Sequence, residues 1–156
     1  MSEMIIRMLI EAFFASVASV GFAMVFNVPK YTLIYCAIGG AITYIARTIL
    51  LHLGIGIEIS TFLASTFIGI IALYWSRKHL IPRPVYTVAS IIPMIPGTYA
   101  FTAMISLVDM NTHGVTQQLI GLFVFNGLKA VSILGAISFG LALPSLYFMR
   151  LNRPII

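Results

Sequence analysis

Charged side chains are scarce in this sequence. Only 8% of its 156 residues are Asp, Glu, Lys or Arg, whereas 60% are hydrophobic and the mean hydropathy is +1.06. A soluble domain carries about a quarter charged residues, so this chain has too few to cover a surface that faces water. A soluble globular protein is therefore excluded, and we predict an integral membrane protein in contact with lipid.

Groups that carry out enzyme chemistry are also few. The chain has one cysteine, three histidines far apart in sequence, and four acidic residues that form no acid/base pair. No two of these residues have the spacing of metal ligands, and the sequence has neither GxSxG nor a glycine-rich phosphate loop. We therefore expect no enzymatic activity and no catalytic residues, and neither a metal nor a cofactor.

Long apolar runs dominate what is present. A helix needs roughly 20 apolar residues to cross the hydrocarbon core. Glu11 interrupts the first run and only Arg7 supplies positive charge ahead of it, so we expect a retained span and not a signal peptide. We predict an all-α, polytopic membrane protein with a single transmembrane domain, residues 1–156, and five helices at about 5–26, 31–53, 57–75, 85–108 and 119–148.

Lysine and arginine are distributed unequally between the predicted loops. Cytoplasmic loops carry the excess of these residues, and in a five-span chain most of them fall on the side of the C-terminus. We therefore predict an external N-terminus and a cytoplasmic C-terminus. The membrane that we expect for this chain is a bacterial-type inner (cell) membrane. The net charge of +5 then needs no nucleic-acid partner. The cytoplasmic cations would be Lys30, Arg77, Lys78, Arg83, Arg150 and Arg153.

The fourth run contains helix breakers in the segment SIIPMIPGTYAFTAMIS, residues 90–106. Pro93 and Pro96 each remove an amide donor, and Gly97 adds flexibility. At helical rise Pro93 lies about 12 Å and Gly97 about 18 Å into the span, on either side of the midplane of a core roughly 30 Å thick. Non-helical backbone survives there only when protein buries it or when it lines a wet cavity. We predict that this span is broken.

A helix that restarts after the break offers its first amides to a ligand. With Pro96 as its first residue, the amides of Gly97, Thr98 and Tyr99 would present the positive end of the helix dipole to an anionic group. Thr102 continues the same face, which is polar along its length. A second interpretation stays open: the prolines only kink the helix, and Ser and Thr hydroxyls satisfy the freed carbonyls.

Lys129 is a second candidate because it lies about 15 Å into the fifth span. Intramembrane charges generally face a cavity or a partner, so Lys129 could be the counter-charge of a carboxylate or could pair with an acid on another subunit. Arg47 near the outer end of the second span, with Glu58 and Asp109, could form an external gate or a structural ion pair. The predicted substrate-binding residues are Pro93, Pro96, Gly97, Thr98, Tyr99, Thr102, Asn126 and Lys129.

The chain resembles a known family. Five spans, the segment RPVYTVASIIPMIPGTYAF (residues 83–101) after a basic loop, and a closing span with a lysine are similar to the threonine/serine exporter family. The closer resemblance is to the small subunit of its split, two-chain form, which corresponds to the C-terminal half of fused exporters. This resemblance implies export of threonine and serine or of succinate-like dicarboxylates, a larger multispanning partner subunit, and coupling to an ion gradient.

The functional hypothesis is a subunit of a secondary exporter of small carboxylate-bearing solutes. Two related five-span halves in series would be inverted relative to each other, which is a recurring transporter plan with a site near the midplane. Because the acids of this chain are few, a coupling carboxylate could belong to the partner. One alternative is a non-conducting subunit that stabilises or assembles another membrane complex. Another is a passive channel.

Overall fold

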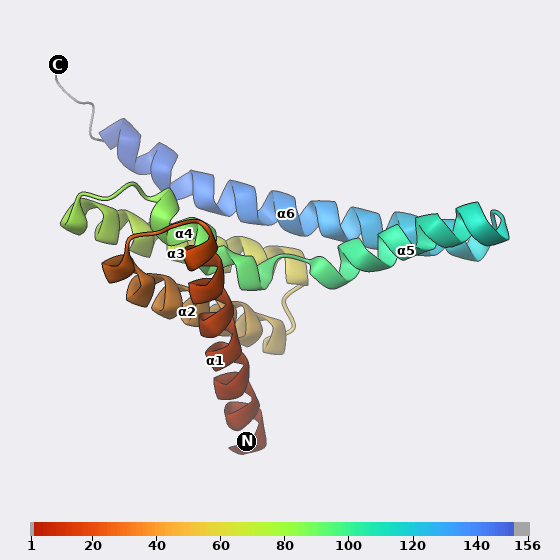
Figure 1. Cartoon of the computed structure of the whole chain (residues 1–156), viewed down its shortest axis with the longest axis horizontal. Coiled ribbons are helices and arrows are strands. Elements are labelled where there is room, and N and C mark those ends of the chain that lie inside the picture. Colours follow the sequence, from red (N-terminus) through yellow and green to blue (C-terminus); the bar gives the residue numbers. More distant parts are fainter. Residues whose placement is uncertain (1, 152–156) are drawn as a thin grey trace. The chain divides into compact units, whose positions relative to one another are not determined.

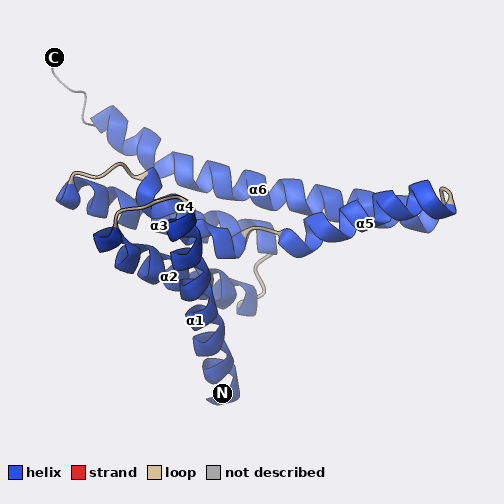
Figure 2. Cartoon of the chain, viewed as in Figure 1, coloured by secondary structure: helices blue, strands red, loops and turns tan. Residues whose placement is uncertain are grey.

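The computed structural model describes residues 2–151. Within this range the chain is helical and has no strand (Figure 2), which confirms the predicted all-α class. Arg153 lies outside the described residues, as does the side chain of Arg150. The elements are α1 (Ser2–Val25), η1 (Lys30–Thr32), α2 (Leu33–His52), α3 (Ile57–His79), α4 (Pro84–Ile91), η2 (Ile92–Met94), α5 (Gly97–His113) and α6 (Gln117–Leu151).

Most of these helices are long and apolar enough to cross a membrane. In the described part of the chain, α1, α2, α3 and α6 each pass that test alone, and α4 with η2 and α5 pass it together as a bent pair. The described residues therefore contain 4 candidate spans, or up to 5 if the bent pair is one span. A polytopic, all-α membrane fold is confirmed, and the helices of the fourth apolar run form a bent pair. The predicted single transmembrane domain stays a prediction.

The chain divides into two compact units (Figure 1). The first unit contains α1 to η2 and the carboxyl-terminal part of α6. The second unit, Ile95–Gly135, contains α5 and the amino-terminal part of α6. Helix α6 thus contributes to both, and its 35 residues extend for about 52 Å at helical rise.

Helix α2 is at the centre of the first unit, where it contacts α1, α3 and α4. Two adjacent glycines allow this close packing. A Cβ atom on Gly39 would meet the hydroxyl of Ser90 on α4, and a Cβ on Gly40 would meet the hydroxyl of Ser19 on α1. Lipid tails are as apolar as leucine, so close backbone approach through small residues is a main source of helix association in membranes.

The carboxyl-terminal part of α6 packs on α3 in a similar way. The Ser65 hydroxyl lies 2.9 Å from the Phe62 carbonyl oxygen and 3.3 Å from the Ala136 carbonyl oxygen. Gly140 has no side chain at this point, and an added Cβ would meet Ser65. Pro144, which lies inside α6, packs against Gly69 on α3.

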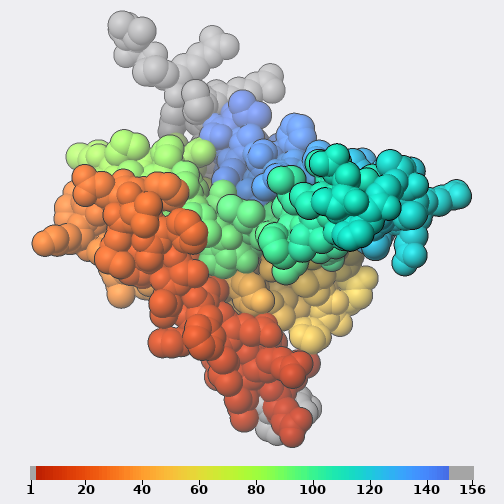
Figure 3. Space-filling model, turned by 45° about the vertical axis from the view of Figure 1, so that its right-hand side comes forward, coloured from red at the N-terminus to blue at the C-terminus, as the bar shows by residue number. Residues whose placement is uncertain are grey.

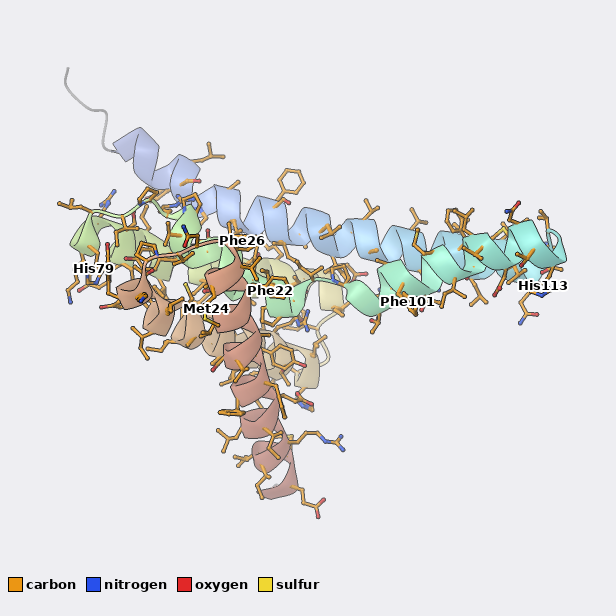
Figure 4. All side chains as sticks on the ribbon, in the orientation of Figure 1. Phe22, Met24, Phe26, His79, Phe101 and His113 are labelled. Atoms are coloured by element: carbon orange, nitrogen blue, oxygen red, sulfur yellow. The ribbon has the colours of Figure 1, made fainter. Side chains whose placement is uncertain are left out.

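Aromatic rings fill the first unit near the carboxyl end of α3. The Tyr35 ring lies 5.1 Å from the Trp75 ring, 4.9 Å from the His79 ring and 5.8 Å from the Tyr86 ring, measured between centroids. Tyr86 is completely buried. Figure 4 labels His79 at the edge of this unit. The rings join α2, α3 and α4 at one end of the first unit.

Large apolar side chains cover the outside. Phe13 and Phe14 on α1 are each 64% exposed, and Figure 3 shows α1, in red to orange, at the surface of the first unit. In the second unit, Phe101 near the start of α5 is 67% exposed and is labelled with His113 in Figure 4. Such exposure fits a surface solvated by lipid.

Candidate functional site

The break in the fourth span is local in origin. Helix α4 ends at Ile91, a 3-10 turn follows, and α5 begins at Gly97. The amide of Gly97 donates to the Ile95 carbonyl at 2.8 Å, and the amide of Ala100 donates to the Pro96 carbonyl at 3.0 Å. Pro96 is therefore the capping residue of α5, one position before its first residue. Its missing amide does no harm there, because the first amides of a helix have no partner within the helix.

Arg47 on α2 reaches this break. Its Nη1 donates to the carbonyl oxygen of Met94 at 3.0 Å. Its guanidinium carbon lies 5.3 Å from the centroid of the Tyr44 ring, a cation–π distance. Met94 is completely buried, and a buried carbonyl without a donor costs about 1–3 kcal/mol. Arg47 thus supplies a donor at the point where the helix no longer does.

The amides at the start of α5 differ from the prediction in one respect. Gly97 was expected to offer its amide to a ligand, but that amide already donates to Ile95. Within residues 2–151, the amides of Thr98 and Tyr99 have no backbone acceptor. Gly97 itself is exposed, with open space where a Cβ would lie. The remaining donors at this helix start are therefore the next two amides.

The hydroxyls along α5 bond back to their own helix. Thr102 donates to the Thr98 carbonyl at 2.9 Å, and Ser106 donates to the Thr102 carbonyl at 2.8 Å. This is the pattern that the kink interpretation of the sequence predicts, with hydroxyls bonded to helix carbonyls. Each hydroxyl oxygen still carries lone pairs that can accept a hydrogen bond. The polar face is therefore an acceptor surface.

Two predicted site residues lie on the first part of α6. Asn126 is 8% exposed, and its Nδ2 donates to the Leu122 carbonyl at 2.8 Å. Lys129 is partly buried. The second unit is a helical hairpin that turns at Gly114 (Figure 1). At helical rise, Lys129 lies roughly 18 Å and Thr98 roughly 22 Å from this turn, so they are at similar heights in the hairpin.

The surroundings of the predicted gate residues are described in part, and an external gate or ion pair stays a prediction. The Asp109 carboxylate lies 3.9 Å from Nδ1 of His113, one turn later on the same helix. Glu58 is in the first turn of α3, where a carboxylate is favoured by the helix dipole. Arg47 contacts the break through the Met94 carbonyl. The sequence placed Arg47 at the outer rim and missed this contact, because nothing local in α2 indicates which carbonyl it reaches.

A hollow of about 920 Å³ lies between α1 and α2, and we call it the α1–α2 pocket. Its walls are mainly apolar, but it also carries charges of both signs. Glu3, Arg7 and Glu11 contribute from α1, and Arg47 and His52 contribute from α2. Residues 7 and 11 lie one turn apart, as do 44 and 48, so each helix presents one face to the pocket. Arg47 is part of both the pocket wall and the break.

Comparison with known proteins identifies the family. Residues 11–147 match the family described as Threonine/Serine exporter, ThrE. The chain belongs to the threonine/serine exporter family. This confirms the resemblance drawn from residues 83–101 and from the five spans. Membership of a multi-pass membrane exporter family, which is not an enzyme family, accounts for the apolar helices. It also accounts for the small number of side chains suited to enzyme chemistry.

The chain is similar in sequence to an uncharacterised protein of Haemophilus influenzae. The two are 42% identical over 151 residues, which cover 97% of this chain and 50% of the relative. The chain thus spans about half the length of the curated relative it matches. No solved structure matches the chain.

Proposed function

We propose that this chain is one subunit of a secondary exporter of small carboxylate-bearing solutes, either threonine and serine or succinate-like dicarboxylates. The solute carboxylate would bind near the midplane, at the broken fourth span. The break in a chain of an exporter family is the observation that carries this proposal. Irregular backbone at membrane depth is tolerated where it is enclosed by protein or lines an aqueous cavity, and transporters place substrate sites at such helices.

The chemistry at the break suits an anion. Helix α5 begins with open amides at Thr98 and Tyr99, and the positive end of its dipole favours negative charge. Lys129 lies at a similar height in the hairpin and would act as counter-charge. Charged groups are expensive inside a membrane and are generally kept for function. A solute carboxylate is an anion that such a set of donors would bind.

A partner would complete the transporter. The Haemophilus influenzae relative is about twice as long as this chain, which supports a plan in which a larger multispanning subunit supplies the other half. The two halves would rock against each other around the bound solute. Coupling to an ion gradient, an external N-terminus and a cytoplasmic C-terminus in a bacterial inner membrane are parts of the same proposal.

Counterflow in proteoliposomes tests this function. The chain and the multispanning protein that co-purifies with it are reconstituted together, and uptake of labelled threonine, serine and succinate is measured against an internal excess of each. Saturable counterflow that requires both chains is expected. Full counterflow by the partner alone would instead support an assembly subunit, and non-saturable flux without counterflow would support a channel. Either result would overturn the proposal.

A further inference from the structure

A small apolar groove lies between the end of α1 and the start of α4, and we call it the α1–α4 groove. Its volume is about 230 Å³, and it is lined by Phe26, Val28, Pro84, Val85, Val88 and Ala89, all of them apolar. Both segments belong to the first unit, and Figure 4 labels Phe26 at the end of α1. The groove shares no lining residue with the break or with the α1–α2 pocket.

The turn after α1 forms one side of the groove. Asn27 has a left-handed backbone with a φ of 54°, a conformation that asparagine tolerates better than most residues. The amide of Asn27 donates to the Met24 carbonyl and the amide of Val28 donates to the Ala23 carbonyl, each at 3.0 Å. These are the paired bonds of a Schellman motif. Val28 also packs against a buried cluster that contains Ala23, so this side of the groove is held by both bonds and packing.

The groove has a packed floor and open walls. Ala89 is part of the same buried cluster, whereas Phe26 is 51% exposed and Val88 is 40% exposed. A pocket that encloses a whole small molecule has about 300–1,000 Å³, so this smaller groove fits one segment of a longer ligand. Because α1 and α2 are both candidate spans, the loop that joins them lies at a membrane surface. A lipid acyl chain that continues along the apolar surface fits such a groove.

Two cations flank the groove in the sequence. Lys30 begins η1, two residues after Val28. Arg83 is the capping residue of α4, one residue before Pro84. Lys30 is exposed and Arg83 is half-buried. Long lysine and arginine side chains lay their apolar stems along an apolar surface and keep the charge at its polar edge, so both charges can reach a headgroup above the groove.

The same end of the first unit carries further positive charge. The Tyr35 ring contacts the rings of both His79 and Tyr86, which places the end of α3, with Arg77 and Lys78, near the start of α4. The acids of this unit are away from this end. Glu3 and Glu58 are in the first turns of α1 and α3, and Glu11 is about 21 Å before the end of α1 at helical rise. The charges here therefore favour an anionic ligand.

We propose that the α1–α4 groove binds one acyl chain of an anionic phospholipid, and that Lys30 and Arg83 bind its phosphate. Lysine and arginine next to membrane helices attract anionic headgroups, and a guanidinium can bind a phosphate through two parallel hydrogen bonds. A neutral lipid would gain the apolar contact alone. The bound lipid would hold the end of α1 to the start of α4. This inference does not depend on which solute is transported.

Tryptophan fluorescence in liposomes tests the site. Trp75, the one native tryptophan, is first replaced by phenylalanine. Phe26→Trp then places a reporter in the groove wall. Phe13→Trp is the matched reporter, because Phe13 is also an exposed phenylalanine of the α1 segment but lies outside the groove. The purified full chain is reconstituted in phosphatidylcholine with increasing fractions of phosphatidylglycerol whose acyl chains carry bromine, a quencher of nearby tryptophan. Brominated phosphatidylcholine measures lipid contact without headgroup selection.

We expect phosphatidylglycerol to quench Phe26→Trp at about a tenfold lower lipid fraction than phosphatidylcholine does. The two brominated lipids should quench Phe13→Trp equally. Equal quenching of Phe26→Trp by the two lipids would leave the groove to another occupant, such as a second protein, and would overturn the proposal.

Charge variants separate a built site from general attraction to a basic surface. In the Phe26→Trp chain, Lys30→Gln with Arg83→Gln should abolish the preference for phosphatidylglycerol. Arg77→Gln with Lys78→Gln removes the same charge from the same end of the first unit and should leave most of the preference. Equal losses in the two pairs would mean that the basic surface attracts the lipid diffusely, which contradicts a site at the groove.

A change of shape without a change of charge gives a second test. Val88→Phe narrows the groove and keeps every cation, so it also serves if Arg83→Gln does not fold. It should abolish the preference for phosphatidylglycerol at Phe26→Trp. A preference that survives Val88→Phe would show that the acyl chain lies outside the groove, and the proposal would then be wrong.

Discussion

The hydroxyl of Ser90 on α4 occupies the space that a side chain on Gly39 of α2 would need. The same hydroxyl donates to the Tyr86 carbonyl at 2.7 Å, which fixes its position. The contact lies one residue before the carboxyl end of α4, where the fourth span breaks. Close packing of α2 against α4 therefore also positions the start of the break beside the helix that carries Arg47.

Substitution of Gly39 should destabilise the first unit. In Gly39→Ala the new Cβ would overlap Ser90 and lie 3.3 Å from Cδ1 of Ile68. Overpacking of this kind costs about 1–3 kcal/mol, which exceeds the roughly 1 kcal/mol that alanine gains over glycine within a helix. The thermal unfolding midpoint in detergent should fall.

The control for this change is Gly21→Ala on α1, where no atom lies within 4 Å of an added Cβ. Its unfolding midpoint should stay the same or rise. Adding Ser90→Ala to Gly39→Ala should restore part of the lost stability, because the overlapping hydroxyl is removed. Equal effects of Gly39→Ala and Gly21→Ala would show that the two helices do not approach this closely.

Removal of the prolines should restore the helix and stop transport. Pro93→Ala with Pro96→Ala returns both amide donors and introduces the residue with the highest helix propensity. We expect counterflow to fall at least about tenfold while the unfolding midpoint does not fall. Pro144→Ala is the matched control, since Pro144 lies inside α6 without breaking it, and it should leave counterflow unchanged. Normal counterflow in the double variant would remove the break from the mechanism.

Lys129 should be needed for transport but not for assembly. In Lys129→Ala we expect counterflow to be abolished, because a carboxylate near the midplane then loses its counter-charge. The partner should still co-purify in normal amount. Lys78→Ala, at the exposed carboxyl end of α3, is the control lysine and should transport normally. If Lys129→Ala loses the partner, the residue serves assembly; if it transports normally, it has no part in binding.

The features predictable from the sequence were those fixed by neighbouring residues. The spans follow from apolar runs of membrane length, and the break follows from Pro93, Pro96 and Gly97, whose effects on the backbone are local. The family could be identified from the same segment. Pro96 was predicted as the first residue of the restarted helix, and it is the capping residue, one position before that helix begins.

Contacts between distant segments could not be predicted in this way. Arg47 and Met94 are 47 positions apart in the sequence. No local pattern indicates that Arg47 donates to the Met94 carbonyl and not to another carbonyl nearby. The α1–α2 pocket also depends on how two helices cross. Gly39 gave no sign of its contact with Ser90, because a glycine within a membrane helix is common. Its role became visible only from the neighbouring helix.

The predicted orientation can be tested at two exposed loop residues. Leu80 follows α3 and is 91% exposed, and Val115 lies between α5 and α6 and is 70% exposed. In the Cys36→Ala background, each is replaced by cysteine and labelled in intact cells with a maleimide that does not cross membranes. Because lysine and arginine gather next to Leu80 and are absent next to Val115, the positive-inside rule places Leu80 in the cytoplasm and Val115 outside. Val115→Cys should be labelled in intact cells, whereas Leu80→Cys should be labelled only after the membrane is opened. The opposite result would invert the topology, and labelling of both from one side would mean that α4 and α5 together do not cross the membrane.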